Sequence, residues 1–358
     1  MMTEPIYIVA ADAVIDGTGD LVTSQTALDH LRAADYRLAE FEISASGDGW
    51  HTALPDNTFR GACSPMLVIN RGRQLIAEGA ADAVVIHGRD FLKTDYQNRK
   101  EDRRRQLKIY DGGKVSILEG YQKLAGEFLD YWHLSPDDFR RAASAIFENH
   151  LRVWRSSHPG AEAPAAKWFK PVSALFRGVD CANPSVDFEG RMVIVGEKAL
   201  RALDFGGMSY CRILSCVVEQ TCQDGLETTP EIVPYKHLAA AYTEACREAG
   251  VDFSTAYLDG AALLEIYTCY PVVPMGFLLS TGLASGVDDI IAFAERHPLT
   301  VSGGLNLAKA PYNNTTLQAF AAVTSALQSR GTPDLAGIHS VGALGYMQAF
   351  VVLERVGG

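Results

Sequence analysis

The same helix-then-strand pattern occurs twice along this chain. Apolar residues on helical spacing predict one helix from Cys63 to Gly79 and another from Thr315 to Arg330, which Gly331 ends. A buried strand is predicted after each helix, and it begins 19 residues after the helix start in both copies, at Asp82 and at Asp334. The sequence therefore predicts a duplicated α/β unit, which restricts the fold to two similar halves.

The two halves share local sequence but differ in length. Their strands carry the same Ile-His pair, at His87 and His339, and each half closes on a second similar strand. The first half, residues 1–205, contains an insert from about 98 to 174 with a charged run and two predicted helices, and the second half spans 206–358. No long linker separates the halves, so we expect them to pack as one body.

Composition excludes several classes of protein. Hydrophobic residues make up 47% and charged residues 21% of the 358 residues, as is typical of a globular protein. A net charge of −11 argues against non-specific nucleic-acid binding, and no apolar run is long enough to span a membrane. Without signal-peptide features, and with seven cysteines on a long chain, we expect a reduced protein in the cytoplasm.

Cys63 is the first candidate for chemistry, because a predicted helix begins at it. The positive end of the helix dipole is expected to lower the pKa of the thiol, which makes Cys63 a candidate nucleophile for acyl transfer. The alternative is a small buried packing residue, a common role of free cysteine. Cys211 and Cys216 lie on a predicted strand without a second pair, so we predict no metal site.

Five segments carry further motifs: Gly61-Ala-Cys-Ser64, Asp180-Cys-Ala-Asn-Pro184, Asp259 to Pro271, Leu299 to Leu305, and Pro311-Tyr-Asn-Asn314. In this order they resemble motifs of the thiolase superfamily, and they are most similar to sterol-carrier-protein-x-type thiolases and bacterial acetyl-CoA acetyltransferase-like proteins. The resemblance covers nearly the whole chain. It implies an α/β fold of two βαβαβαββ halves in five layers, with the insert as a loop domain over a coenzyme A tunnel.

The resemblance also implies partners and a substrate class. A homodimer is usual in the family, and coenzyme A enters as part of the thioester substrate, so we expect no further cofactor. With Cys63 as the counterpart of the thiolase nucleophile, the segment before the second repeat helix and the Gly-rich C-terminal loop are expected to bind substrate. The residues concerned are Gly303, Gly304, Lys309, Asn313, Asn314 and Gly342.

This sequence departs from the thiolase pattern at the acid/base residues. The Gly-His-Pro triplet falls on Lys309-Ala-Pro311, and the later histidine of the acetyltransferase-like group falls on Gln318. The C-terminal loop from Ser340 to Tyr346 has no counterpart of the second thiolase cysteine. Alanine cannot take a proton from a thiol, so ordinary Claisen chemistry lacks its usual acid/base groups.

Three residues are candidates to replace the missing groups. His339 and Tyr346 lie near the C-terminal loop, and Cys269 lies in a motif that the family places near the active centre. For His339 and Tyr346, packing in the core is the alternative. Lys309 is a further candidate, to hold a thiolate or a coenzyme A phosphate by its charge, with an exposed loop lysine as the alternative.

Three functions fit these observations. The first is a thiolase-like acyltransferase that takes the acyl group of a coenzyme A or carrier-protein thioester on Cys63, as an enzyme of lipid metabolism. The second is a retro-aldolase that splits a β-hydroxyacyl-CoA with Tyr346 or His339 as base, together with a small zinc-ribbon/OB-fold partner. The third is a non-catalytic subunit that binds acyl-CoA.

Overall fold

The computed structural model describes residues 4–101, 104, 107–202, 209–329 and 333–357. The predicted junction of the halves at residues 205 and 206 lies outside these residues, as do Arg330 and Gly331. Where the described residues test them, the predicted repeat elements are confirmed. The first repeat helix is α2 (Ser64–Ala77), and the second is α14 (Thr315–Gln328).

Among the described residues, nine strands form one large sheet in the order β3-β2-β4-β7-β1-β8-β11-β10-β9. Their bounds are β1 (Ile6–Ile15), β2 (Leu38–Ile43), β3 (Thr58–Phe59), β4 (Ala83–Phe91), β7 (Asp187–Gly196), β8 (Tyr210–Gln220), β9 (Ala262–Glu265), β10 (Leu335–Gly342) and β11 (Met347–Val356). A short hairpin of β5 (Lys108–Tyr110) and β6 (Val115–Ser116) forms a separate sheet.

The large sheet repeats one pairing scheme in its two parts. In the first part β1 and β7 are antiparallel, β7 and β4 are antiparallel, and β4 and β2 are parallel. The second part repeats these three relations: β8 and β11 are antiparallel, β11 and β10 are antiparallel, and β10 and β9 are parallel. A short antiparallel contact between β1 and β8 joins the parts. The duplication expected from sequence is therefore visible in strand order and direction.

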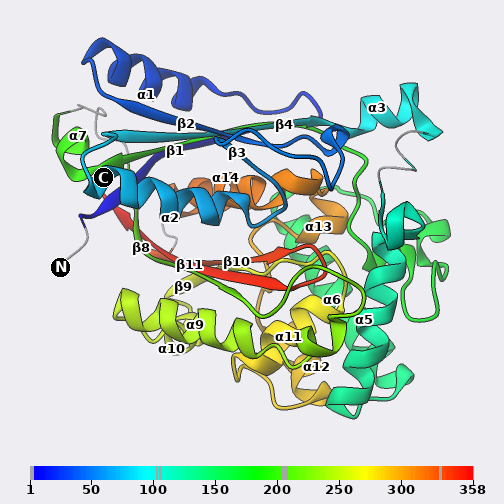
Figure 1. Ribbon diagram of the computed structural model, residues 1–358. Helices are drawn as coiled ribbons and strands as arrows, with labels where there is room; N and C mark the ends of the chain where they lie inside the picture. The colour runs from blue at the N-terminus through cyan, green and yellow to red at the C-terminus, as the bar shows by residue number, and fades with distance from the viewer. Residues whose placement is uncertain (1–3, 102–103, 105–106, 203–208, 330–332, 358) are drawn as a thin grey trace.

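Helices and the two parts of the sheet make five layers (Figure 1). The two repeat helices α2 and α14 lie between the two parts and share one apolar core with both. The outer face of the first part is covered by α1 (Val22–Ala33) and α7 (Glu197–Ala202). The outer face of the second part is covered by α9 (Lys236–Ala249), α10 (Phe253–Leu258), α11 (Val272–Ser280) and α12 (Val287–Arg296).

The insert packs on the second half of the molecule. Its two predicted helices are α5 (Ile117–Trp132) and α6 (Pro136–Ser157), which Ser116 and Ser135 cap in capping boxes. Apolar side chains such as Phe128 and Phe139 join the core that contains α9 and α11. The insert therefore forms a wall beside the second half, in addition to its solvated charged face.

The remaining helices of the described segments are short. They are α3 (Leu92–Asn98), α8 (Thr229–Ile232) and α13 (Gly304–Leu307), with 3₁₀ turns at η1 (Ser46–Asp48), η2 (Asp111–Gly113), η3 (Ala166–Phe169), η4 (Gly178–Asp180) and η5 (Tyr312–Asn314). In the part of the chain that the structure describes, no helix is both long and apolar enough to cross a membrane.

Candidate active site

A cavity of about 240 Å³ lies where the N-terminal ends of α2 and α14 approach each other. We call it the α2/α14 cavity. Its wall comes from both halves and from the insert, which reaches it through the β5–β6 hairpin and the start of α5. The wall residues are Trp50, Gly61, Ala62, Leu107, Ile109, Tyr110, Ser116, Ile117, Leu118, Tyr121, Ala182, Pro184, Tyr267, Cys269, Tyr270, Ala310, Tyr312, Asn313, Thr315, Val341 and Ala343.

The wall is rich in tyrosine and carries no ionic group. None of its residues, in the described parts of the chain, is Asp, Glu, His, Lys or Arg. Burial raises the pKa of Tyr121, Tyr267 and Tyr270 well above the ordinary value. These phenols therefore stay protonated at neutral pH, and the wall offers neutral hydrogen-bond donors instead of charges.

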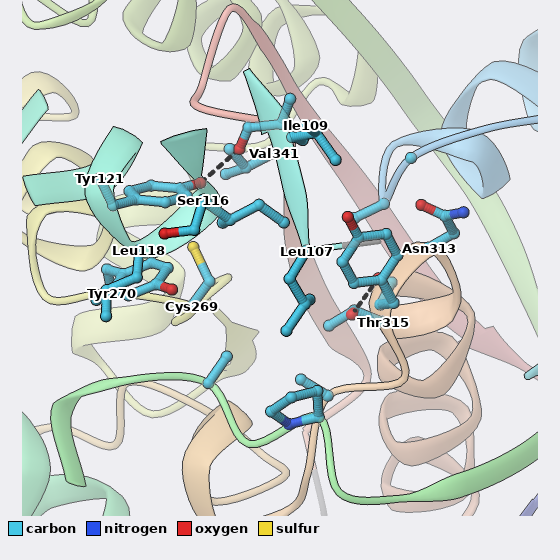
Figure 2. A pocket seen from close by; sticks show the side chains of 18 of the residues that line it. Leu107, Ile109, Ser116, Leu118, Tyr121, Cys269, Tyr270, Asn313, Thr315 and Val341 are labelled. Atoms are coloured by element: carbon cyan, nitrogen blue, oxygen red, sulfur yellow. Dashed lines mark hydrogen bonds between the residues drawn. The ribbon is translucent and has the colours of Figure 1, made fainter. Parts of the chain in front are cut away.

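Cys269 is the one predicted catalytic residue that lies in the wall. Its thiol lies beside Tyr121, whose hydroxyl donates to the carbonyl oxygen of Ala343 at 2.5 Å. The Tyr121 ring stacks on Tyr270, with 4.3 Å between the ring centroids. Burial raises the pKa of the Cys269 thiol to about 12. Figure 2 shows these three side chains on one side of the cavity, with Asn313 and Thr315 on the other.

Cys63 lies behind the wall. It occupies the N-cap position of α2, as the sequence predicts, but its side chain is only 2% exposed and the cavity is lined by its neighbours Gly61 and Ala62. Burial raises the pKa of the Cys63 thiol to about 12. The expected lowering of this pKa is therefore wrong, because exclusion from water opposes the charged form more strongly than the helix end favours it.

Ser340 is the polar contact of Cys63. The Ser340 hydroxyl lies 3.4 Å from the Cys63 sulfur, to which it can donate, 3.2 Å from the carbonyl oxygen of Ala62, and 2.7 Å from the Thr316 hydroxyl. Sequence reasoning missed Ser340 as a partner of the thiol. Its place one residue after His339 in the repeat is the signal that could have identified it.

His339 faces the opposite side of β10 from Ser340, and it does not line the cavity. Its Nε2 lies 2.7 Å from Oε1 of Gln348, and its ring centroid is 4.9 Å from that of Phe277. Burial lowers the pKa of His339 to about 4, so the ring is neutral. The structure thus gives His339 a place in the core and removes it from the set of bases at this site.

Tyr346 is close to the site but outside the wall. It is partly buried in the turn between β10 and β11, where burial raises its pKa to about 12. A Cβ placed on Gly342 would lie 3.3 Å from its ring and 2.9 Å from Met347, which leaves no room for a side chain at that position. Gly342 therefore serves close packing of the turn, and it does not line the cavity either.

The predicted substrate-binding asparagines differ in position. Asn313 lines the cavity, and its Nδ2 donates to the carbonyl oxygen of Ser44 at 2.8 Å. Asn314 is fully buried behind it, and neither polar atom of its amide has a hydrogen-bond partner among the described residues. Ala310, at the place of the thiolase histidine, lines the cavity as a methyl group.

Lys309, Gly303 and Gly304 lie outside the wall. The Lys309 Nζ donates to the carbonyl oxygen of Ser185 at 3.2 Å, and the residue has φ +70°. Gly303 and Gly304 also have positive φ, and a Cβ on Gly304 would lie 2.7 Å from the ring of His150 on α6. This Gly-Gly pair therefore allows the loop to turn tightly against the insert.

A second hollow, of about 410 Å³, adjoins the cavity. The two share Leu118, Ala182, Pro184 and Tyr270. The hollow also contains Lys309, Glu162 and the exposed Trp168. In the described residues no cluster of three or more His, Cys, Asp or Glu side chains is placed to hold a metal ion.

Comparison with known proteins supports a thiolase architecture. No protein-family model and no curated protein matches the sequence. A monomeric SCP2-thiolase-like protein type 1 from Mycobacterium smegmatis is 17% identical with a TM-score of 0.68, over 98% of this chain and 77% of that one. An Ltp2–ChsH2 (DUF35) aldolase is 12% identical with a TM-score of 0.63, over 99% and 98% of the chains.

A thiolase from Ascaris suum in complex with coenzyme A, Acat5, gives the same picture. It is 12% identical with a TM-score of 0.63, over 99% of this chain and 100% of the other. At such low identity the likeness concerns the fold and leaves the reaction open. Strand order, the five layers and these neighbours agree with the resemblance seen in the sequence, and the chain therefore has the thiolase fold.

Proposed function

We propose that this protein is a thiolase-fold retro-aldolase that cleaves the bond between the α- and β-carbons of a β-hydroxyacyl thioester. One observation carries the proposal. Five tyrosines line the α2/α14 cavity, while the Cys63 thiol lies behind its wall and no imidazole lines it in the described parts of the chain. A site of neutral hydroxyls suits a reaction that needs proton transfer and no nucleophile.

The size of the cavity supports binding of the acyl end of the substrate. At about 240 Å³ it holds roughly eight atoms of the size of a water molecule, at ~30 Å³ each. The coenzyme A part would then lie in the adjoining hollow, where Lys309 offers a positive charge and Trp168 a flat apolar surface. Coenzyme A enters as part of the substrate in this proposal.

The proposed reaction is balanced without a further cofactor. The β-hydroxyl loses its proton, the Cα–Cβ bond breaks, and its electron pair forms the enolate of a shortened thioester. The β-carbon becomes an aldehyde or ketone, and the α-carbon takes up the proton. A neutral phenol such as Tyr267 can donate to the thioester oxygen as negative charge develops there, and one such donor contributes about 100-fold or more to a rate.

One structural neighbour is an aldolase in complex with a DUF35 protein. By analogy we propose that a small zinc-ribbon/OB-fold partner assists this chain as well. A homodimer and a cytoplasmic location remain predictions from the sequence. Size-exclusion chromatography of the chain with and without its partner would test the assembly.

Product analysis tests the proposed function. The wild-type protein is incubated with β-hydroxyacyl-CoA compounds, and shortened acyl-CoA and the carbonyl product are measured by liquid chromatography and mass spectrometry. We expect Tyr267→Phe to lower kcat/KM about 100-fold and Cys63→Ala to leave it within about threefold. Tyr242→Phe, which removes a buried hydroxyl bonded to Ser254 away from the cavity, is the matched control.

Acyl transfer through Cys63 is the second candidate, because the Ser340 hydroxyl is placed to donate to its sulfur and because Gly61 and Ala62 bring the start of α2 to the cavity. Loss of acyl transfer on alkylation of Cys63, with no C–C cleavage, would favour this candidate. Absence of any turnover, with retained acyl-CoA binding, would favour the third function, a non-catalytic binding subunit.

A further inference from the structure

A carboxyl group lies directly behind the tyrosine wall. Asp224 belongs to the loop that follows β8, and it is partly buried without lining the cavity. Its Oδ1 accepts a hydrogen bond from the Tyr110 hydroxyl at 3.0 Å, and its Oδ2 accepts one from Nε1 of Trp50 at 3.2 Å. Tyr110 and Trp50 both line the cavity, so one carboxylate connects to two side chains of the wall.

We propose that Tyr110 and Asp224 form the proton-accepting pair of the α2/α14 cavity. Tyr110 is the group that meets the substrate, and Asp224 is the positioning residue that takes up its proton. The inference rests on the proposed retro-aldol function and supplies the base that the wall itself lacks. Neither residue belongs to the segments that resemble thiolase motifs: Tyr110 comes from the insert and Asp224 from the second half.

The proton balance of the step is simple. As the Cα–Cβ bond breaks, the β-hydroxyl proton passes to the phenol oxygen of Tyr110, and the Tyr110 proton passes to Oδ1 of Asp224. The same path in reverse returns one proton to the α-carbon of the enolate. No charge remains on the pair after turnover, and no oxidant or reductant is consumed. A positioned acid/base pair of this kind contributes about 100- to 10,000-fold to a rate.

The surroundings of Asp224 suit a proton acceptor. Burial raises its pKa, against the opposing effect of the Tyr110, Trp50 and Leu344 N–H hydrogen bonds. A raised carboxyl pKa increases the affinity of the base for a proton near neutral pH. The other titratable groups that act on it are His51 from the segment of Trp50, Tyr346 from the β10–β11 turn and Cys222 from its own loop.

A pH profile with matched variants tests the pair. We expect Tyr110→Phe and Asp224→Asn each to lower kcat for C–C cleavage about 100-fold or more, with KM within about threefold. Wild-type kcat/KM should decrease at low pH as Asp224 becomes protonated. This decrease, the acid limb of the pH profile, should be absent in Asp224→Asn. Tyr110→Phe keeps the aromatic ring and the hydrogen bond from Trp50 to Asp224, so this variant remains informative if Asp224→Asn does not fold.

Asp187→Asn is the matched control. Asp187 is partly exposed, like Asp224, and accepts two hydrogen bonds from Thr94, but it does not line the cavity. Its substitution should leave both kcat and the acid limb unchanged. A wild-type acid limb that persists in Asp224→Asn, with kcat within about threefold of wild type, overturns the inference. No turnover by the wild-type protein contradicts the proposed function instead.

A second readout does not depend on turnover. The emission of Trp50, obtained as the difference between wild type and Trp50→Phe, should change with pH as Asp224 ionises, because its indole N–H donates to that carboxylate. We expect a midpoint above the ordinary range of aspartate, about 4, and no such transition in Asp224→Asn. A midpoint at or below that range overturns the inference even if the protein proves to be an aldolase.

Discussion

The starts of the two central helices make the same contact across the molecule with different chemistry. Cys63 caps α2 and touches Ser340 on β10, in the other half. Asn314 caps α14 and lies against Gly88 on β4, again in the other half. Gly88 and Ser340 are equivalent, since each follows the Ile-His pair of its repeat. Each half therefore presents a helix N-cap to the same strand position of its counterpart.

The difference shows how equivalent positions of a duplicated fold can carry different side-chain chemistry. At Ser340 the strand supplies a hydroxyl that can donate to a thiol. At Gly88 it supplies space, because a Cβ there would lie 1.8 Å from Oδ1 of Asn314. The Asn314 amide fills this space without a hydrogen bond among the described residues. The first half thus places a buried thiol against a hydroxyl, and the second places a space-filling amide against a glycine.

The largest expected effect concerns Glu265, at the equivalent place in the second half to Phe41 in the first. Glu265 lies opposite Ile338 in the β9–β10 pair, and Phe41 lies opposite Ile86 in the β2–β4 pair. Glu265 is buried and accepts hydrogen bonds from the amides of Val301 and Ser302 and from the Ser302 hydroxyl. Burial nevertheless raises the pKa of Glu265 to about 7 from its ordinary 4.5.

This raised pKa makes stability depend on pH. The folded state binds a proton more tightly than the unfolded state, so the contribution is full below pH 4.5 and is lost as pH rises to about 7. We expect the free energy of unfolding to fall by about 3 kcal/mol over this range, measured by urea denaturation. Glu265→Gln should remove most of this dependence of the free energy of unfolding on pH. Glu248→Gln, on the exposed end of α9, is the control and should leave it unchanged. A pH dependence that persists in Glu265→Gln contradicts this prediction.

The next effect tests the close contact at Gly88. Gly88→Ala should lower the free energy of unfolding by about 2 kcal/mol, because the new methyl group meets the Asn314 amide and lies 3.3 Å from Cβ of Ile43. The control is Gly126→Ala on α5, where nothing lies within 4 Å of the added Cβ and helix propensity predicts a gain of about 0.5–1 kcal/mol.

A double variant separates the clash from a general weakening of the strand. Combining Gly88→Ala with Asn314→Ala should recover most of the lost stability, since the amide that opposes the methyl group is gone. Asn314 makes no side-chain cap bond to α14, so its removal alone should cost less than about 1 kcal/mol. Equal losses in the single and double variants would show that Asn314 is not the residue in the way.

A smaller effect is expected on the other side of the comparison. Ser340→Ala removes the hydroxyl partner of Cys63 and leaves the Thr316 hydroxyl without it, which should cost about 1–2 kcal/mol. The Ser340 hydrogen bond lowers the thiol pKa, so its loss should also slow iodoacetamide labelling of Cys63 at high pH. Labelling of the more exposed Cys222 serves as the internal control; faster labelling of Cys63 would contradict the assigned contact.

The smallest effect is expected at the first-half counterpart of His339. His87 is partly exposed and lies between two carboxylates. Its Nδ1 is 3.2 Å from Oε2 of Glu42, and its Nε2 is 3.1 Å from Oε1 of Glu189. Surface pairs of this kind contribute about 0–1 kcal/mol, so His87→Gln should change stability by less than about 1 kcal/mol. The buried His339 should be more sensitive, because His339→Leu leaves Oε1 of Gln348 unpaired. Equal losses at both positions would contradict the different burial of the two histidines.

Local sequence patterns predicted the repeat, and long-range packing determined the site. Helical spacing after Cys63 and before Gly331, together with the Ile-His strands, was enough to predict both central helices and the duplicated sheet. The pKa of Cys63 was predicted in the wrong direction because local sequence shows a helix start but not its burial. The wall tyrosines of the insert and Asp224 were missed, since only the folded chain brings Tyr110 and Asp224 to one cavity.

The order of the repeat residues shows a second limit of sequence reasoning. Cys63 and Thr315 are equivalent by distance to the strand that follows, since each lies 19 residues before the predicted start of that strand. By the helix start, however, Cys63 is equivalent to Asn314, because these two residues are the N-caps of α2 and α14. Thr315 lines the cavity and Asn314 lies behind it, so a shift of one residue changes which side chain reaches the cavity. Motif resemblance correctly indicated the thiolase fold, but it selected Gly303, Gly304 and Lys309, which the structure places outside the cavity wall.

In the proposed reaction the cavity acts through neutral hydroxyls while Cys63 remains behind its wall. Intact-protein mass spectrometry after incubation with acyl-CoA and β-hydroxyacyl-CoA tests it most directly, with peptide mapping to locate any adduct. We expect shortened acyl-CoA in solution and no acyl group on the protein at any time point. An acyl adduct that maps to Cys63, forms within the turnover time and disappears in Cys63→Ala would contradict it.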